Sequence, residues 1–111
     1  MRTQRQRWNA AWKAVANLGA YTQLNRMDCC RTCAACDMEG NYKPGTPVVW
    51  TYGGQGNYLA FARDTGMARN DYQYIYHENG GAHLIVTALR NEGFDVEWDG
   101  DDTRAVLCRF V

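Results

Sequence analysis

The segment AHLIVTALRNEGFDVEWDG, residues 82–100, is the stretch of the sequence that decides the fold. Its first half places apolar residues at helical spacing, with Ile85 and Leu89 on one face, and a glycine follows as a natural stop. Its second half alternates apolar and polar residues with a period of two and ends in an Asp-Gly turn signal. The segment therefore predicts a helix over 82–92 that leads into a β-hairpin over 94–111.

A second amphipathic helix is predicted before this segment, over residues 5–18, where apolar residues again recur at helical spacing and a glycine follows. Each helix has a single apolar stripe, which needs a sheet to cover it. We expect the core to contain Trp8, Trp12, Val15, Leu18, Ile85, Leu89 and Val96.

Between the helices, β-branched and aromatic residues predict strands over 47–52, 58–62 and 72–77. The first two flank a glycine-rich stretch and are expected to pair as a hairpin. With the hairpin over 94–111, the pattern predicts an α+β fold: a four- or five-stranded, mostly antiparallel sheet with the two amphipathic helices on one face. A chain of 111 residues has room for one domain, so residues 1–111 are expected to form a single unit.

Composition and charge narrow the classes of function. The formal net charge is zero, which gives no overall attraction to nucleic acid or acidic membranes. Residues 1–43 carry seven basic against three acidic side chains, whereas residues 44–111 carry five against nine. No apolar run approaches the roughly 20 residues that a membrane span needs, and no signal peptide is evident. We expect a cytoplasmic protein without a membrane partner.

Four of the five cysteines are crowded together, at Cys29, Cys30, Cys33 and Cys36. They lie in a segment, 28–45, that has no periodicity and is predicted to be an irregular loop. The CxxxCxxC spacing also occurs at the iron–sulfur site of radical enzymes, but those need a large barrel that this chain cannot supply. Two interpretations stay open: a zinc site formed by the four thiolates, with His77 as an alternative ligand, and reduced cysteines without metal.

The two interpretations make different structural predictions. With zinc bound, the thiolates should surround one ion at about 2.3 Å. Without metal, Cys30 and Cys33 should be buried and Cys36 more exposed. In both cases a loop of this length needs something to order it, so the cysteine segment is expected to be the structural centre of the protein.

The leading functional hypothesis is a non-catalytic binding or accessory protein that contacts a macromolecule, because no nucleophile–base pair and no convincing cofactor loop is evident. A small cysteine-dependent enzyme, with Cys30 as nucleophile and His77 as base, is one alternative. A zinc-knuckle nucleic-acid binder is another alternative, and nucleic acid is the less favoured class of partner. Its phosphate contacts would come from Arg2, Arg5, Arg7 and Lys13.

Two signatures carry a resemblance to a known family: C-C-x-[ST]-C, which starts at Cys29, and A-L-x-x-E-G-[FL]-x-V-E-W-D-G, over 88–100. Together they resemble an uncharacterised domain-of-unknown-function family of actinobacteria and their phages, over almost the whole chain. The resemblance implies a phage-encoded protein that acts on a host or phage macromolecule in a bacterial cell, and it implies no activity. This chain has Phe-Ala-Arg at 61–63 where many relatives have paired histidines, and relatives often lack Cys36.

Overall fold

The structure is a computed structural model that describes residues 2–111, and it shows an α+β fold built on one five-stranded sheet. The elements follow the order α1 (Gln4–Asn17), β1 (Tyr21–Arg26), α2 (Arg31–Met38), the 3-10 turn η1 (Glu39–Asn41), β2 (Val48–Tyr52), β3 (Tyr72–Glu78), α3 (Gly81–Asn91), β4 (Asp95–Glu97) and β5 (Val106–Arg109). The strand order is β1-β2-β3-β5-β4. Only β1 and β2 are parallel, and the other neighbours pair antiparallel. The predicted fold class is confirmed.

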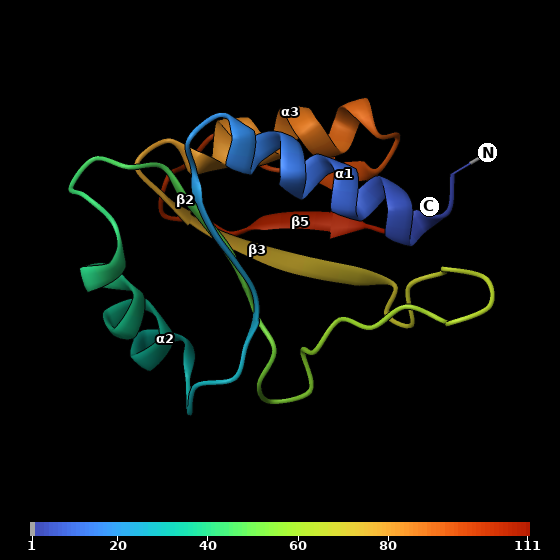
Figure 1. Ribbon diagram of the computed structural model, residues 1–111, viewed down its shortest axis with the longest axis horizontal. Coiled ribbons are helices and arrows are strands. Elements are labelled where there is room, and N and C mark those ends of the chain that lie inside the picture. The colour runs from blue at the N-terminus through green and yellow to red at the C-terminus, as the bar shows by residue number, and fades with distance from the viewer. Residues whose placement is uncertain (1) are drawn as a thin grey trace.

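The helices cover the sheet unequally (Figure 1). α1 and α3 lie side by side on one face, as predicted, and their apolar stripes pack on inward-facing strand residues such as Val49, Ile75 and Val106. A third helix, α2, lies on the opposite face, where Ala34 and Met38 pack against β2. α2 covers the β1–β2 half of that face and leaves the β3–β5–β4 half without a helix.

The predicted core is confirmed except at Leu18. The other six residues, Trp8, Trp12, Val15, Ile85, Leu89 and Val96, are all buried. Leu18 is 68% exposed, because it is the C-cap of α1 and the chain turns away after it. Gly19 makes that turn with a φ of +98°, which glycine adopts without strain.

The prediction of an irregular loop over 28–45 is wrong, because the segment contains α2 and η1. β1 was not predicted either, and it pairs parallel with β2. A parallel pair needs a crossover connection, and α2 is the helix of that crossover. β1, α2 and β2 thus form a βαβ unit at one end of the sheet.

The predicted strand over 58–62 is also wrong. That segment makes only an isolated bridge, Phe61 with Ala68, and β2 pairs with β1 and β3 instead. The side chain of Asn25 explains the difference: it donates to the Leu59 carbonyl and accepts from the Leu59 N–H, both at 2.9 Å. One amide side chain thus satisfies both backbone groups of Leu59, and β1 and β3 occupy the two edges of β2 at which the segment was expected to pair.

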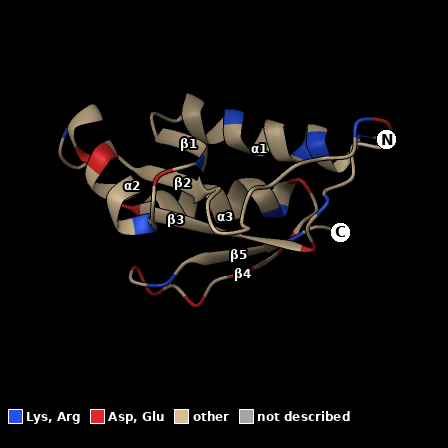
Figure 2. Cartoon of the chain, turned by 90° about the horizontal axis from the view of Figure 1, so that it is seen from below, with Lys and Arg blue, Asp and Glu red and all other residues tan. Residues whose placement is uncertain are grey.

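Helix α1 carries Arg5, Arg7 and Lys13 but no acidic side chain, whereas the loop between β4 and β5 carries several aspartates together with Arg104 (Figure 2). Elsewhere, basic and acidic side chains lie close together, as in the ion pairs of Arg26 and Arg109. Among the described residues, no helix is both long enough and apolar enough to cross a membrane.

Candidate functional site

Three cysteines meet where β1 ends and α2 begins. The Sγ atoms of Cys29, Cys30 and Cys33 all lie within 4.8 Å of one another, and those of Cys29 and Cys33 are 3.0 Å apart. Cys29 and Cys30 lie in the turn after β1, Cys30 is the N-cap of α2, and Cys33 is in the first turn of the helix. Three sulfur ligands this close together are able to hold one metal ion.

The βαβ unit explains why these sulfurs meet. On an α-helix, residues four apart have Cβ atoms roughly 5–6 Å apart. Cys29 lies in the turn just before the helix and Cys33 in its first turn, so the start of α2 brings the two side chains to the same place, and their sulfurs lie 3.0 Å apart. The site also lies at the carboxyl end of parallel strand β1, the edge at which open α/β sheets commonly bind ligands.

The thiols differ in their acidity. The backbone N–H of Cys33 at the start of α2 stabilises the Cys30 thiolate, and with the Cys33 thiol it lowers the pKa of Cys30. The neighbouring Cys29 and Cys30 sulfurs raise the pKa of Cys33 to about 12. Cys108, by contrast, is fully buried between the sheet and the helices, and burial raises its pKa to about 12. Cys30 therefore ionises before Cys33.

Two side chains at the ends of β1 and β2 hold the cysteine turn in place. Arg26 binds Asp28 through two hydrogen bonds of 2.9 and 3.0 Å and also pairs with Asp37 on α2. The Tyr52 hydroxyl donates to the carbonyl of Asp28 at 2.7 Å. The Arg26 guanidinium lowers the pKa of Asp28 through these hydrogen bonds. Sequence reasoning missed these residues, although an Arg-x-Asp immediately before a cysteine pair was a usable signal.

A shallow groove of about 520 Å³ opens beside the cluster. Its walls are formed by Cys30, Arg31, Thr32, Ala35, Cys36, Trp50, Gln55 and Tyr76. Trp50 packs on Tyr76 with ring centroids 4.9 Å apart, and the Arg31 guanidinium lies 5.0 Å above the Tyr76 ring. The groove therefore combines two thiols, a cation and aromatic surface.

The remaining predicted site residues lie apart from the cluster. Cys36 is exposed and outside the group of three, although it lines the same groove as Cys30. His77 follows Tyr76 on β3, so its side chain faces the other side of the sheet, and its Nε2 lies 2.6 Å from the Arg104 carbonyl oxygen. The structure does not bring Cys30 and His77 together as nucleophile and base.

The packing predicted for cysteines without metal is wrong. Cys33 is exposed and Cys30 is only half-buried, so neither serves as a small apolar core residue. Cys36 is exposed, as that prediction required. Exposed thiols that point at one another favour a chemical role over a packing role.

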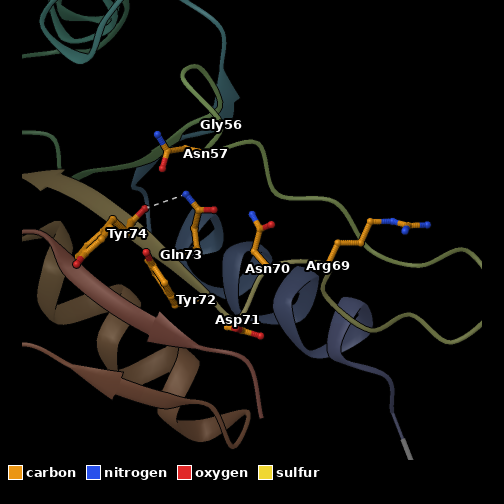
Figure 3. A pocket seen from close by; sticks show the side chains of 8 residues that line it. All are labelled: Gly56, Asn57, Arg69, Asn70, Asp71, Tyr72, Gln73 and Tyr74. Atoms are coloured by element: carbon orange, nitrogen blue, oxygen red, sulfur yellow. Dashed lines mark hydrogen bonds between the residues drawn. The ribbon is translucent and has the colours of Figure 1, made fainter.

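A second candidate surface is the part of the sheet that α2 leaves uncovered. Tyr72 and Tyr74 project from β3 on this face and are 52% and 43% exposed. By register, Arg109 and Leu107 of β5 lie beside them. Figure 3 shows the polar pocket at one end of this row. It is lined by Gly56, Asn57, Arg69, Asn70, Asp71, Tyr72, Gln73 and Tyr74.

The basic residues expected to contact nucleic acid are not beside the cysteines. They belong to the α1 region, whereas α2 lies on the opposite face of the sheet (Figure 1). Two of them make intramolecular contacts: Arg2 pairs with Glu92, and Arg7 donates to the Glu92 carbonyl and stacks on Phe94. These contacts leave fewer free cations on α1 than the sequence suggested.

Comparisons of the chain with protein-family models, with curated proteins and with solved structures find no match. The functional argument therefore depends on the chemistry of the site itself.

Proposed function

We propose that this protein is a non-catalytic, zinc-binding accessory protein. The observation that carries the proposal is the convergence of the Cys29, Cys30 and Cys33 sulfurs within 4.8 Å at the carboxyl end of β1. Thiolates are the ligands that structural zinc sites use most, and such sites commonly contribute directly to folding.

Cys30 is the sulfur whose surroundings favour metal binding. Cys30 has a lowered pKa, so it gives up its proton more readily than an ordinary thiol, as a metal ligand must. A structural zinc ion takes four ligands. Cys36 is the fourth ligand in the proposal, because it is the remaining thiol of the segment and lines the same groove as Cys30. The ion would then join the end of β1 to two turns of α2.

Contact with a macromolecule is proposed at the uncovered face of the sheet, where Tyr72 and Tyr74 are exposed. Tyrosine and arginine are enriched at the energetic centres of protein interfaces, and Arg109 lies beside Tyr72 on this face. The family resemblance favours a host or phage macromolecule as the partner.

Elemental analysis of protein purified without added metal tests zinc binding. We expect one zinc per chain, and we expect a chelator to lower the melting temperature, since ligand at a thousandfold excess over Kd stabilises a protein by about 4 kcal/mol. Substituted Co²⁺ should show a thiolate charge-transfer band that weakens in Cys33→Ser and Cys36→Ser. A stoichiometry well below one, together with stability that chelator does not change, would exclude the zinc site.

Cross-linking in a host lysate, followed by mapping of the linked residues, tests the contact surface. Replacing Tyr72 and Tyr74 by alanine should remove the cross-links. The same change at Tyr58, which is 55% exposed but lies outside β3, should leave them in place. Cross-links that survive the β3 changes would place the partner elsewhere.

A further inference from the structure

The sulfur pair Cys29–Cys33 has the arrangement of a dithiol that is ready to form a disulfide. The two Sγ atoms are 3.0 Å apart, which is about 1 Å longer than a disulfide bond. Cys33 is fixed by the first turn of α2, whereas Cys29 lies in the turn before the helix and has no helical hydrogen bonds to break. The bond is therefore within reach of a small movement of the turn.

Thiol–disulfide exchange also requires that a reagent in solution can reach the two sulfurs. Cys29 and Cys33 are both exposed, so a small disulfide in solution reaches either sulfur directly. Cys108 offers a contrast within the same chain, because it is fully buried and its sulfur is shielded from reagents. Cys36 is exposed but does not belong to the group of three sulfurs that lie within 4.8 Å of one another, so it is not one of the preformed pairs.

We propose that Cys29 and Cys33 exchange with low-molecular-weight disulfides, such as glutathione disulfide, and that closing their bond displaces the metal ion. In the first step one thiolate attacks the small disulfide, forms a mixed disulfide and releases one glutathione thiolate. In the second step the other cysteine attacks the mixed disulfide and releases the second glutathione. The protein loses two electrons and two protons, and the disulfide gains them as two molecules of glutathione.

Disulfide formation should release zinc because Cys29 and Cys33 are two of the proposed zinc ligands. A disulfide sulfur is no longer a thiolate, so closing the bond removes two of the three clustered ligands. Cys30 and Cys36 alone would hold zinc weakly. This part of the inference rests on the proposed zinc site, whereas the exchange itself needs only the two thiols.

Mass spectrometry of the full-length, metal-free protein treated with glutathione disulfide under anaerobic conditions tests the exchange. We expect the main product to lose two hydrogens rather than to gain glutathione, and dithiothreitol to reverse the change. Trypsin cleaves after Arg26, Arg31 and Arg63 but not between Lys43 and Pro44, so the new bond should link peptide 27–31 to peptide 32–63. A product that only carries glutathione would overturn the proposal.

The variants Cys29→Ser and Cys33→Ser together identify the pair, because peptide 27–31 also contains Cys30 and the second peptide also contains Cys36. Cys29 and Cys33 are exposed, so neither serine should disturb folding, which near-ultraviolet circular dichroism checks. We expect each variant to lose the cross-link between the two peptides. If the cross-link persists in either variant, the bond involves Cys30 or Cys36 and the proposed pair is wrong.

Zinc-loaded protein tests the coupling. A chromogenic chelator that is in molar excess over the protein but too weak to remove zinc from the reduced protein should record one zinc released for each disulfide closed. Zinc that stays bound after the cross-link forms would refute displacement. A protein that never binds zinc but still forms the cross-link would refute the proposed function and leave the exchange standing, so the two failures are distinguishable.

Discussion

Replacing Tyr52 by phenylalanine is the most direct test that the sheet holds the cysteine turn. The side chain is 2% exposed, and its hydroxyl donates to the Asp28 carbonyl at 2.7 Å, one residue before Cys29. The change removes a single oxygen atom and leaves the packing of the ring on α2 intact. Its effect therefore reports the hydrogen bond alone.

The expected loss in the free energy of unfolding depends on how well water replaces the Tyr52–Asp28 hydrogen bond. A typical intramolecular hydrogen bond contributes about 1 kcal/mol, and leaving a buried partner unsatisfied costs about 1–3 kcal/mol. The Asp28 turn is only partly buried, so water replaces part of the lost bond. We expect the free energy of unfolding of the metal-free protein to fall by about 1 kcal/mol. Zinc affinity should fall as well, by about tenfold, because the turn that carries two of the proposed ligands loses one of the two side chains that hold it.

Urea unfolding of the metal-free protein and competitive zinc titration measure the two effects. Tyr58→Phe is the matched control, because it makes the same chemical change at a side chain that is 55% exposed and whose hydroxyl donates no hydrogen bond among the described residues. If Tyr52→Phe differed from the control by less than about 0.3 kcal/mol and bound zinc equally well, the anchoring role would be wrong.

Two further predictions concern residues that support the sheet and the cysteine turn. Gly81→Ala should lower the free energy of unfolding by about 2–3 kcal/mol or prevent folding, because a Cβ there would lie 2.2 Å from the Val48 carbonyl oxygen. Gly40→Ala is the control, because nothing lies within 4 Å of a Cβ at that position. In the same thermal unfolding experiment it should lower the free energy of unfolding by less than about 0.5 kcal/mol. The Arg26 ion pair lowers the pKa of Asp28, so its contribution is present above the ordinary aspartate pKa of 3.8 and is lost as pH falls through the lowered value. Metal-free wild type should therefore lose more stability between pH 5 and pH 2 than Arg26→Gln, and equal losses in urea titrations would contradict this.

The sequence predicted best the elements whose apolar pattern is strong and local. α3 and the following hairpin combine a clear helical stripe with strict alternation, and the structure has α3 at Gly81–Asn91 and β4 and β5 inside the predicted hairpin. β1 has no such pattern. Its residues are half-buried or exposed, and its partner β2 is more than twenty residues away in the chain, so its pairing is a property of the tertiary structure.

α2 was missed for a different reason. Its apolar stripe consists of Ala34 and Met38, which is too short to stand out in a helix that also contains two cysteines, Thr32 and Asp37. The strand predicted over 58–62 shows the opposite failure. Its local composition favours a strand, but the side chain of Asn25 satisfies Leu59 and displaces the pairing.

The sequence could identify the cysteines of the site but not their geometry, because the geometry depends on the parallel strand pair. Arg26 and Tyr52 are the last residues of β1 and β2 and are partners in the register, so both side chains reach the Asp28 turn from the same end of the sheet. The turn must then start α2 directly, which puts Cys30 at the N-cap. Any change in the bonding of the cysteines, by metal or by disulfide, therefore acts on the β1–β2 pair through these two side chains.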